Sequence, residues 1–230
     1  ESLALEKLIY PCFCNRARLQ SIASAPHVGE VAHRYDGHCR HIDEEEVKML
    51  SAEKDPSLRL SIDSCDIEFT DRWQGVQHIH LEGELDDYVL RRGDGMYAYN
   101  LAVVLDDIAM GITEIIRGDD LLDTTGQQIY LYKTLQQCLH SKHIKVPSYG
   151  HAPLLIDSEG HRLSKRQKSI TIRELRDNQW SANRIVGELA IAGGLVKANT
   201  LNNREISISE LIEIDLNLPS LRQKTIEIKI

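Results

Sequence analysis

The sequence has no long apolar run, no excess of basic residues and no even set of cysteines, and each absence narrows the class of protein. No stretch approaches 18 consecutive apolar residues, so we expect no membrane-spanning helix. Residues 1–9 contain acids and no small-residue cleavage site, so they do not resemble a signal peptide, and we expect a cytoplasmic protein. The net charge of −8 argues against non-specific binding to polyanions, although a local basic surface is compatible with it.

The five cysteines do not predict a disulfide framework in a cytoplasmic protein. We expect Cys65 and Cys138, which stand alone, to be small buried apolar residues. A single residue separates Cys12 from Cys14, and Cys39 follows after a loop, so the three thiols could converge on one zinc ion. The segment between them has almost no core pattern, and a metal would help to order it. The alternative is three free cysteines in a loose loop.

The spacing leaves the fourth ligand of such a site open. His33, His38 and His41 are the chemically easier choices. Tyr35 would have to lose its phenolic proton, which a bound dication promotes.

The periodicity of apolar residues predicts an α/β core. Alternation over residues 58–91 predicts strands, with a hairpin turn at 71–75. The pattern becomes helical over 97–107, a short buried strand follows at 112–116, and a long helix runs from Asp120 to about Leu139. A helix, a buried strand and a further helix make an α/β unit.

Helix start and stop signals organise the two ends of the chain. Apolar residues within 1–9 have helical spacing, and because this pattern is already under way at Glu1 we expect the chain to be part of a longer polypeptide. Asp43, followed by three glutamates, predicts a capped helix start in which the acids face the positive end of the dipole.

Residues beyond about 170 have the composition of a small, mostly helical appendage. Ser181 is expected to cap a helix that stops at Gly193 and Gly194, and Ser207 begins a capping box. We therefore expect a catalytic domain over residues 1–170, containing a zinc-binding segment at 11–41 and a strand-rich insertion at 58–91, and an appendage over 171–230.

Two further groups could bind ligands. Tyr99 lies at a predicted helix start and Arg117 follows the buried strand, and ligand sites of open α/β sheets gather at such ends of core elements. An arginine there can hold a carboxylate with two hydrogen bonds, but a structural salt bridge to a nearby aspartate is equally compatible. Arg162-Leu163-Ser164-Lys165, followed by Arg166, could handle phosphate, although such a basic cluster alone is more often a solvated turn.

Together these residues resemble the glutamate-specific class I aminoacyl-tRNA synthetases. The segments 99–107 and 111–120 are similar to the amino-acid site of that family, and 162–166 is similar to its second signature loop, usually written KMSKS. Arg162 and Leu163 replace the usual lysine and methionine. The resemblance implies that Tyr99 and Arg117 bind L-glutamate and that Lys165 binds ATP, with Mg²⁺ as the ion accompanying ATP.

The resemblance is closer to the branch of this family that modifies queuosine in tRNA(Asp). That branch has a zinc site of three cysteines and a tyrosine, which implies one Zn²⁺ held by Cys12, Cys14, Tyr35 and Cys39. It also lacks a large anticodon-binding half, and only 65 residues follow Lys165 in the 230-residue chain. The branch implies ATP-dependent activation of glutamate and its transfer to the queuosine base of tRNA(Asp), by positioning and charge stabilisation and with no catalytic side-chain nucleophile.

The family's first signature, a histidine-containing ATP loop, is missing from the sequence, and so is the first strand of the nucleotide-binding fold. We expect both to precede Glu1, so that the chain as given is catalytically incomplete. The expected fold is therefore a class I synthetase Rossmann-type α/β domain without its N-terminal part, with a zinc-binding insertion and a small helical appendage, and we expect a monomer.

Two alternatives remain at this stage. One is a fragment of a conventional glutamyl-tRNA synthetase that charges a tRNA 3′ end, and the other is a non-catalytic, zinc-stabilised binding module. Arginines of the appendage could contact RNA or form a solvated helix face; the candidates are Arg173, Arg176 and Arg184.

Overall fold

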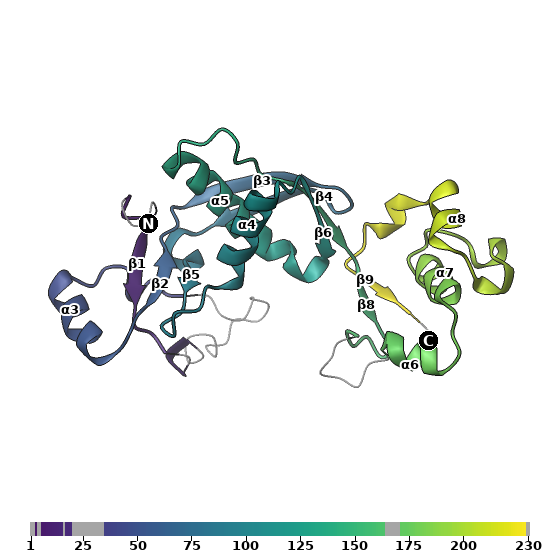
Figure 1. Ribbon diagram of the computed structural model, residues 1–230, viewed down its shortest axis with the longest axis horizontal. Helices are drawn as coiled ribbons and strands as arrows, with labels where there is room; N and C mark the ends of the chain where they lie inside the picture. The colour runs from purple at the N-terminus through teal and green to yellow at the C-terminus, as the bar shows by residue number, and fades with distance from the viewer. Residues whose placement is uncertain (1–2, 4–5, 16, 20–34, 164–170, 229–230) are drawn as a thin grey trace. The chain divides into compact units, whose positions relative to one another are not determined.

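The structure is a computed structural model that describes residue 3 and residues 6–15, 17–19, 35–163 and 171–228 (Figure 1). The chain divides into two compact units that interleave along the sequence. Unit 1 comprises residues 1–69, 77–113 and 123–147, and unit 2 comprises 70–76, 114–122 and 148–230. The domain boundary expected near residue 170 lies inside unit 2, and the division into a catalytic domain and an appendage stays a prediction.

A three-stranded antiparallel sheet organises the N-terminal part of unit 1. Its order is β1-β2-β5, formed by Ile9–Cys12, Ser57–Leu60 and Tyr88–Arg91 (Figure 1). Ile9 pairs with Leu60 and Cys12 pairs with Ser57. Strand β1 therefore places Cys12 in the interior of unit 1, where it is buried. The helical pattern expected over residues 1–9 is wrong at its end. Ile9 begins strand β1, because the antiparallel pairing of β1 with β2 takes precedence over local helical spacing.

Helices α3, α4 and α5 also belong to unit 1. Helix α3, Glu44–Glu53, begins at the predicted cap, where the Asp43 side chain accepts a hydrogen bond from the amide of Glu46. Helix α4 spans Tyr99–Met110 and ends at Gly111, whose φ of 68° is the left-handed conformation that glycine adopts without strain. Helix α5, Leu122–Cys138, contributes several buried core side chains, which are Ile129, Leu131, Tyr132 and Leu135.

The strands predicted over 58–91 are confirmed, and they continue into a second sheet. Its order is β4-β3-β7-β6, formed by Gly75–Leu81, Cys65–Asp71, Ser148–Ala152 and Glu114–Gly118. The predicted hairpin turn lies between the end of β3 and the start of β4. Strand β6, expected at 112–116, runs two residues further along the chain. It pairs in parallel with β7 over its whole length.

The C-terminal part of unit 2 combines short helices with a strand pair. Strands β8, Leu154–Ile156, and β9, Thr225–Glu227, pair in parallel (Figure 1). The helices are α6, Ile172–Asp177, α7, Ala182–Ala192, and α8, Ile208–Glu213.

The helix signals expected in this region are confirmed, but the strand pair was not predicted. Ser181 caps α7, Gly193 follows its end, and Ser207 forms a capping box with Glu210. Strands β8 and β9 have only three residues each, too few for a period-2 pattern to stand out.

Within the described part of the chain, no helix is long and apolar enough to cross a membrane.

Candidate functional sites

Three thiols meet in unit 1. Cys12 ends β1, Cys14 follows two residues later, and Cys39 returns from a turn. Their sulfur atoms all lie within 4.8 Å of one another, and the sulfurs of Cys14 and Cys39 are 3.6 Å apart. The three thiols therefore converge, as a metal site requires, and this group could hold a metal ion.

Tyr35 lies against the same thiols. Its phenolic oxygen is 3.7 Å from the sulfur of Cys12 and accepts a hydrogen bond of 2.7 Å from the backbone amide of Cys39. Only 3% of Tyr35 is exposed. By contrast, the ring nitrogen Nε2 of His41 lies 2.9 Å from a carboxylate oxygen of Glu84, on a side chain that is 74% exposed. His33 lies outside the described residues.

The donor set is compatible with a zinc ion in its chemistry and spacing. Zinc prefers sulfur and nitrogen ligands in a tetrahedron with Zn–S bonds of about 2.3 Å, which places two ligand sulfurs about 3.8 Å apart. The 3.6 Å between Cys14 and Cys39 and the 3.7 Å between Cys12 and the Tyr35 oxygen approach that separation. Three thiols and a phenol would close all four positions, which is typical of a structural rather than a catalytic site.

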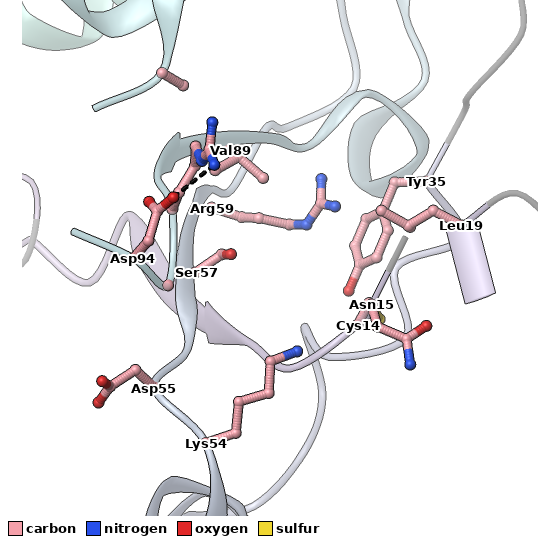
Figure 2. Close-up of a pocket in the computed structure, with 13 residues that line it drawn as sticks. Cys14, Asn15, Leu19, Tyr35, Lys54, Asp55, Ser57, Arg59, Val89 and Asp94 are labelled. Atoms are coloured by element: carbon pink, nitrogen blue, oxygen red, sulfur yellow. Dashed lines mark hydrogen bonds and ion pairs between the residues drawn. The ribbon is translucent and has the colours of Figure 1, made fainter. Parts of the chain in front are cut away.

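Two arginines donate hydrogen bonds to the thiol sulfurs. Arg59 is 5% exposed, and its Nε lies 3.2 Å from the sulfur of Cys12. Its guanidinium carbon is 3.8 Å from the centre of the Tyr35 ring, and Figure 2 shows the side chain pointing toward that ring. Arg18 reaches the sulfur of Cys14 at 3.5 Å. Positive charge therefore lies beside a group of thiols that would become negative on binding a metal ion.

These neighbours give the Cys12 and Cys14 thiols different pKa values. Burial raises the pKa of the Cys12 thiol, but the hydrogen bond and charge of Arg59, together with hydrogen bonds from the Cys14 amide and Tyr35, outweigh burial, so the net pKa lies below the ordinary value. Burial and the neighbouring charge of Cys12 raise the pKa of Cys14 to about 12. Burial likewise raises the pKa of Tyr35. Without a metal ion, the Cys12 thiol, whose pKa is lowered, ionises more readily than that of Cys14.

A cavity of about 1270 Å³ opens beside the thiol cluster (Figure 2). Cys14, Tyr35 and Arg59 form one side of its lining, and Lys54 and Arg92 add further positive charge. Asp94 offsets part of that charge, because it forms an ion pair of 2.5 Å with Arg92.

In unit 2, Arg117 lies at the end of a buried chain of polar groups. Strands β6 and β7 place Arg117 directly opposite His151, and the Nε of Arg117 donates a 3.0 Å hydrogen bond to Nε2 of His151. The other ring nitrogen, Nδ1, lies 2.6 Å from a carboxylate oxygen of Asp71. The guanidinium also lies 5.3 Å from the centre of the Tyr149 ring and donates to the carbonyl oxygen of Leu121.

Asp71 is held as a carboxylate at the other end of that chain. Burial raises the pKa of its carboxyl, but hydrogen bonds from the amide of Gln74, from His151 and from the amide of Trp73 outweigh burial, so the pKa lies below its usual range. The same hydrogen bonds form the turn between β3 and β4.

Tyr99 belongs to unit 1, where it is the first residue of α4 and 57% exposed. The next residue, Asn100, accepts a 3.0 Å hydrogen bond from the side chain of Gln128, which fixes the start of the helix against α5.

The first two residues of the predicted signature loop are anchored in unit 2. Arg162 forms an ion pair of 2.8 Å with Asp120. The amide of Leu163 donates to the carbonyl of Leu155. The remaining residues, Ser164, Lys165 and Arg166, lie outside the described part of the chain.

Sequence reasoning missed Asp71, His151 and Arg59. Each is an isolated polar residue in a strand or at its end, and a single sequence does not show that it is buried and paired across strands. The one available signal is the position of Asp71 before a turn, a place where aspartate often accepts backbone hydrogen bonds.

Comparison with known proteins identifies the family that shares this architecture. The family described as "tRNA synthetases class I (E and Q), catalytic domain" matches residues 2–223. A glutamyl-Q tRNA(Asp) synthetase of Symbiobacterium thermophilum is 42% identical over 196 residues, covering 84% of this chain and 58% of the relative. The enzyme of the same name from Nitratidesulfovibrio vulgaris is 41% identical over 195 residues, with 84% and 58% covered. The chain thus spans less than two thirds of the length of these curated relatives.

Solved structures agree on the fold. A glutamate-tRNA synthetase of Elizabethkingia anophelis superimposes with a TM-score of 0.74 at 22% identity, over 99% of this chain and 49% of that one. A glutamate tRNA ligase of Elizabethkingia meningosepticum, solved in complex with its amino acid, gives a TM-score of 0.71 at 22% identity, over 98% and 49%.

Proposed function

This chain belongs to the catalytic-domain family of class I tRNA synthetases for glutamate and glutamine, and from that premise we propose that it forms part of an enzyme that joins glutamate to the queuosine base of tRNA(Asp). The observation that most supports this acceptor is the 42% and 41% identity to two enzymes that bear the name glutamyl-Q tRNA(Asp) synthetase. The family fold supports the reaction class, because class I synthetases activate an amino acid before they transfer it. The place of action is the cytoplasm, and the protein is a monomer.

The proposed reaction has two steps. The carboxylate of L-glutamate attacks the α-phosphate of ATP, which releases pyrophosphate and leaves a glutamyl adenylate. A hydroxyl of the queuosine base then attacks the activated carbonyl and releases AMP. Neither step needs a nucleophile from the protein, so the protein acts by positioning the reactants and stabilising charge.

The proposed residue roles follow the family pattern. Arg117 and Tyr99 contact the glutamate substrate, and Lys165 contacts ATP, which binds with Mg²⁺. Arg117 is well suited to a carboxylate ligand, because a guanidinium offers two parallel donors. Its Nε is engaged by His151, which leaves the orientation of the group defined before substrate arrives.

The zinc-binding group is proposed to be structural. One Zn²⁺ bound by Cys12, Cys14, Cys39 and Tyr35 would tie strand β1 to the turn around Cys39, which closes the loop between them. The proposed catalytic domain ends near residue 170, and residues 171–230 form the appendage.

Glutamate-dependent exchange of pyrophosphate into ATP tests the activation step in the full-length protein. We expect exchange with L-glutamate, and we expect Arg117→Ala to lose it while the exposed Arg222→Ala retains it. If the protein is folded and contains zinc but shows no exchange with glutamate, the result would favour the non-catalytic binding module instead.

A further inference from the structure

We propose that Asp71 and His151 are positioning residues for Arg117, and that they act by holding the imidazole of His151 in a single tautomer. The inference rests on the proposed role of Arg117 in binding glutamate. Neither Asp71 nor His151 belongs to the ligand set described above, and all three residues lie in unit 2.

The tautomer follows from the hydrogen-bond partners. An arginine Nε always carries a proton and can only donate, so Nε2 of His151, at 3.0 Å, must accept and carries no proton. The remaining ring proton then lies on Nδ1, where it is donated to the Asp71 carboxylate at 2.6 Å. The ring is therefore neutral, with its acceptor nitrogen aimed at Arg117.

Because Asp71 and His151 are buried, we assign them a positioning role rather than a catalytic one. The side chains of His151 and Asp71 are both 0% exposed, so no substrate can reach them. Arg117, by contrast, is partly exposed on β6. The polar chain thus begins inside the protein and ends on the one member that a ligand can reach.

The rest of the surroundings make this arrangement stiff. The second oxygen of Asp71 accepts from the backbone amides of Trp73, Gln74 and His151, at 3.0, 2.9 and 3.2 Å. The His151 ring stacks on Tyr149 with an interplanar angle of 13°. His151 fixes the orientation of the Arg117 guanidinium through its Nε. The ligand therefore does not have to order this group, and such preorganisation increases affinity.

An Asp71→Asn substitution tests the tautomer with little change in shape. The asparagine oxygen can keep the backbone hydrogen bonds, while its amide group becomes a donor toward Nδ1. Nδ1 must then accept, the ring proton moves to Nε2, and an N–H group faces the Nε–H of Arg117. A substitution of this kind beside a catalytic histidine is known to act by enforcing the wrong tautomer.

The first measurement is the ¹⁵N NMR spectrum of the histidines in the full-length protein, with His151 assigned from its loss in His151→Gln. We expect the Nδ1–H tautomer in the wild type and the Nε2–H tautomer in Asp71→Asn, together with a shift of the Arg117 Nε signal. A wild-type ring that is protonated on Nε2 would overturn the proposal, whatever the enzyme's activity.

The second measurement is KM for glutamate in pyrophosphate exchange. We expect Asp71→Asn to raise the KM for glutamate about tenfold or more, because the hydrogen bond between His151 and the charged Arg117 is lost. The KM for ATP should be unchanged. His151→Gln, whose amide can donate to Asp71 and accept from Arg117, should restore part of the affinity that His151→Leu loses. Glu114→Gln, an exposed change on the same strand, is the matched control and should leave KM unchanged.

The outcomes separate the two proposals. If the wild type shows the Nδ1–H tautomer but no glutamate-dependent exchange, the proposed function fails while the Asp71–His151–Arg117 arrangement stands. If exchange is normal and a folded Asp71→Asn protein keeps the wild-type KM for glutamate, the positioning role is wrong and the proposed function stands.

Discussion

The Nε of Arg59 donates a 3.2 Å hydrogen bond to the sulfur of Cys12. This pairing places a buried cation directly beside a thiol of the proposed metal site. Three thiolates and a phenolate carry more negative charge than one Zn²⁺ neutralises, so a cation among the ligands lowers the cost of burying the assembled site. Arg59 and Cys12 are 47 residues apart in the chain.

Replacing Arg59 is therefore expected to weaken zinc binding. Partners of this kind outside the metal's own ligands typically account for a tenfold to hundredfold change in affinity. We expect Arg59→Met to fall in about that range, as measured by competition with a chromophoric chelator. Arg92→Met, which removes an exposed cation from the same cavity, is the control, and equal zinc affinity in the two variants would contradict this role of Arg59.

Cys39→Ser is expected to release zinc. The variant removes the sulfur that lies 3.6 Å from that of Cys14, so the remaining donors can no longer close a tetrahedron of protein ligands. Elemental analysis should show about one zinc per chain in the wild type and in Cys138→Ser, and little in Cys39→Ser. Proteolysis should become faster within residues 11–41 only. If the wild-type protein contains no zinc after purification without chelator, the metal proposal is wrong.

Protonation of Asp71 is expected to lower the stability of the folded protein at acidic pH. Its pKa is lower in the folded protein than the value of about 3.9 usual for an unfolded chain, so its carboxylate stabilises the fold above that pH. This contribution is lost as the pH falls from about 4 through the lower folded-state pKa. Thermal unfolding should therefore show a steeper loss of Tm below about pH 4 in the wild type than in Asp71→Asn. Parallel curves would contradict the assignment.

Gly187→Ala is expected to destabilise unit 2. A Cβ at this position of α7 would clash with the backbone carbonyl oxygen of Arg204, and backbone cannot yield as a flexible side chain does. Overpacking of this kind costs about 1–3 kcal/mol, and sometimes more. Denaturant unfolding measures the loss, and Leu189→Ala, on an exposed position of the same helix, should lose less.

Local signals explain how much of the fold was predictable. Caps at Asp43, Ser181 and Ser207 depend on residues within one helical turn, and the structure confirms all three. The pairing of β8 with β9 depends on segments about 70 residues apart, which leave no mark on a single sequence.

The same distinction applies to the sites. Cys12 and Cys14 were recognisable because thiols are rare and closely spaced. Asp71 and His151 were not, because aspartate and histidine are common and only a long-range strand pairing, 80 residues apart, brings them together. The supporting partners of a site are therefore harder to predict than its ligands.

The choice of acceptor is the central claim, and labelled glutamate tests it most directly. The full-length protein is incubated with ATP, radiolabelled glutamate and, in separate reactions, tRNA(Asp) with queuosine, tRNA(Asp) without it, and tRNA(Glu). The account predicts label only on the queuosine-containing tRNA(Asp), in the anticodon fragment after nuclease cleavage. Label at the 3′ end of tRNA(Glu), with queuosine ignored, would contradict it.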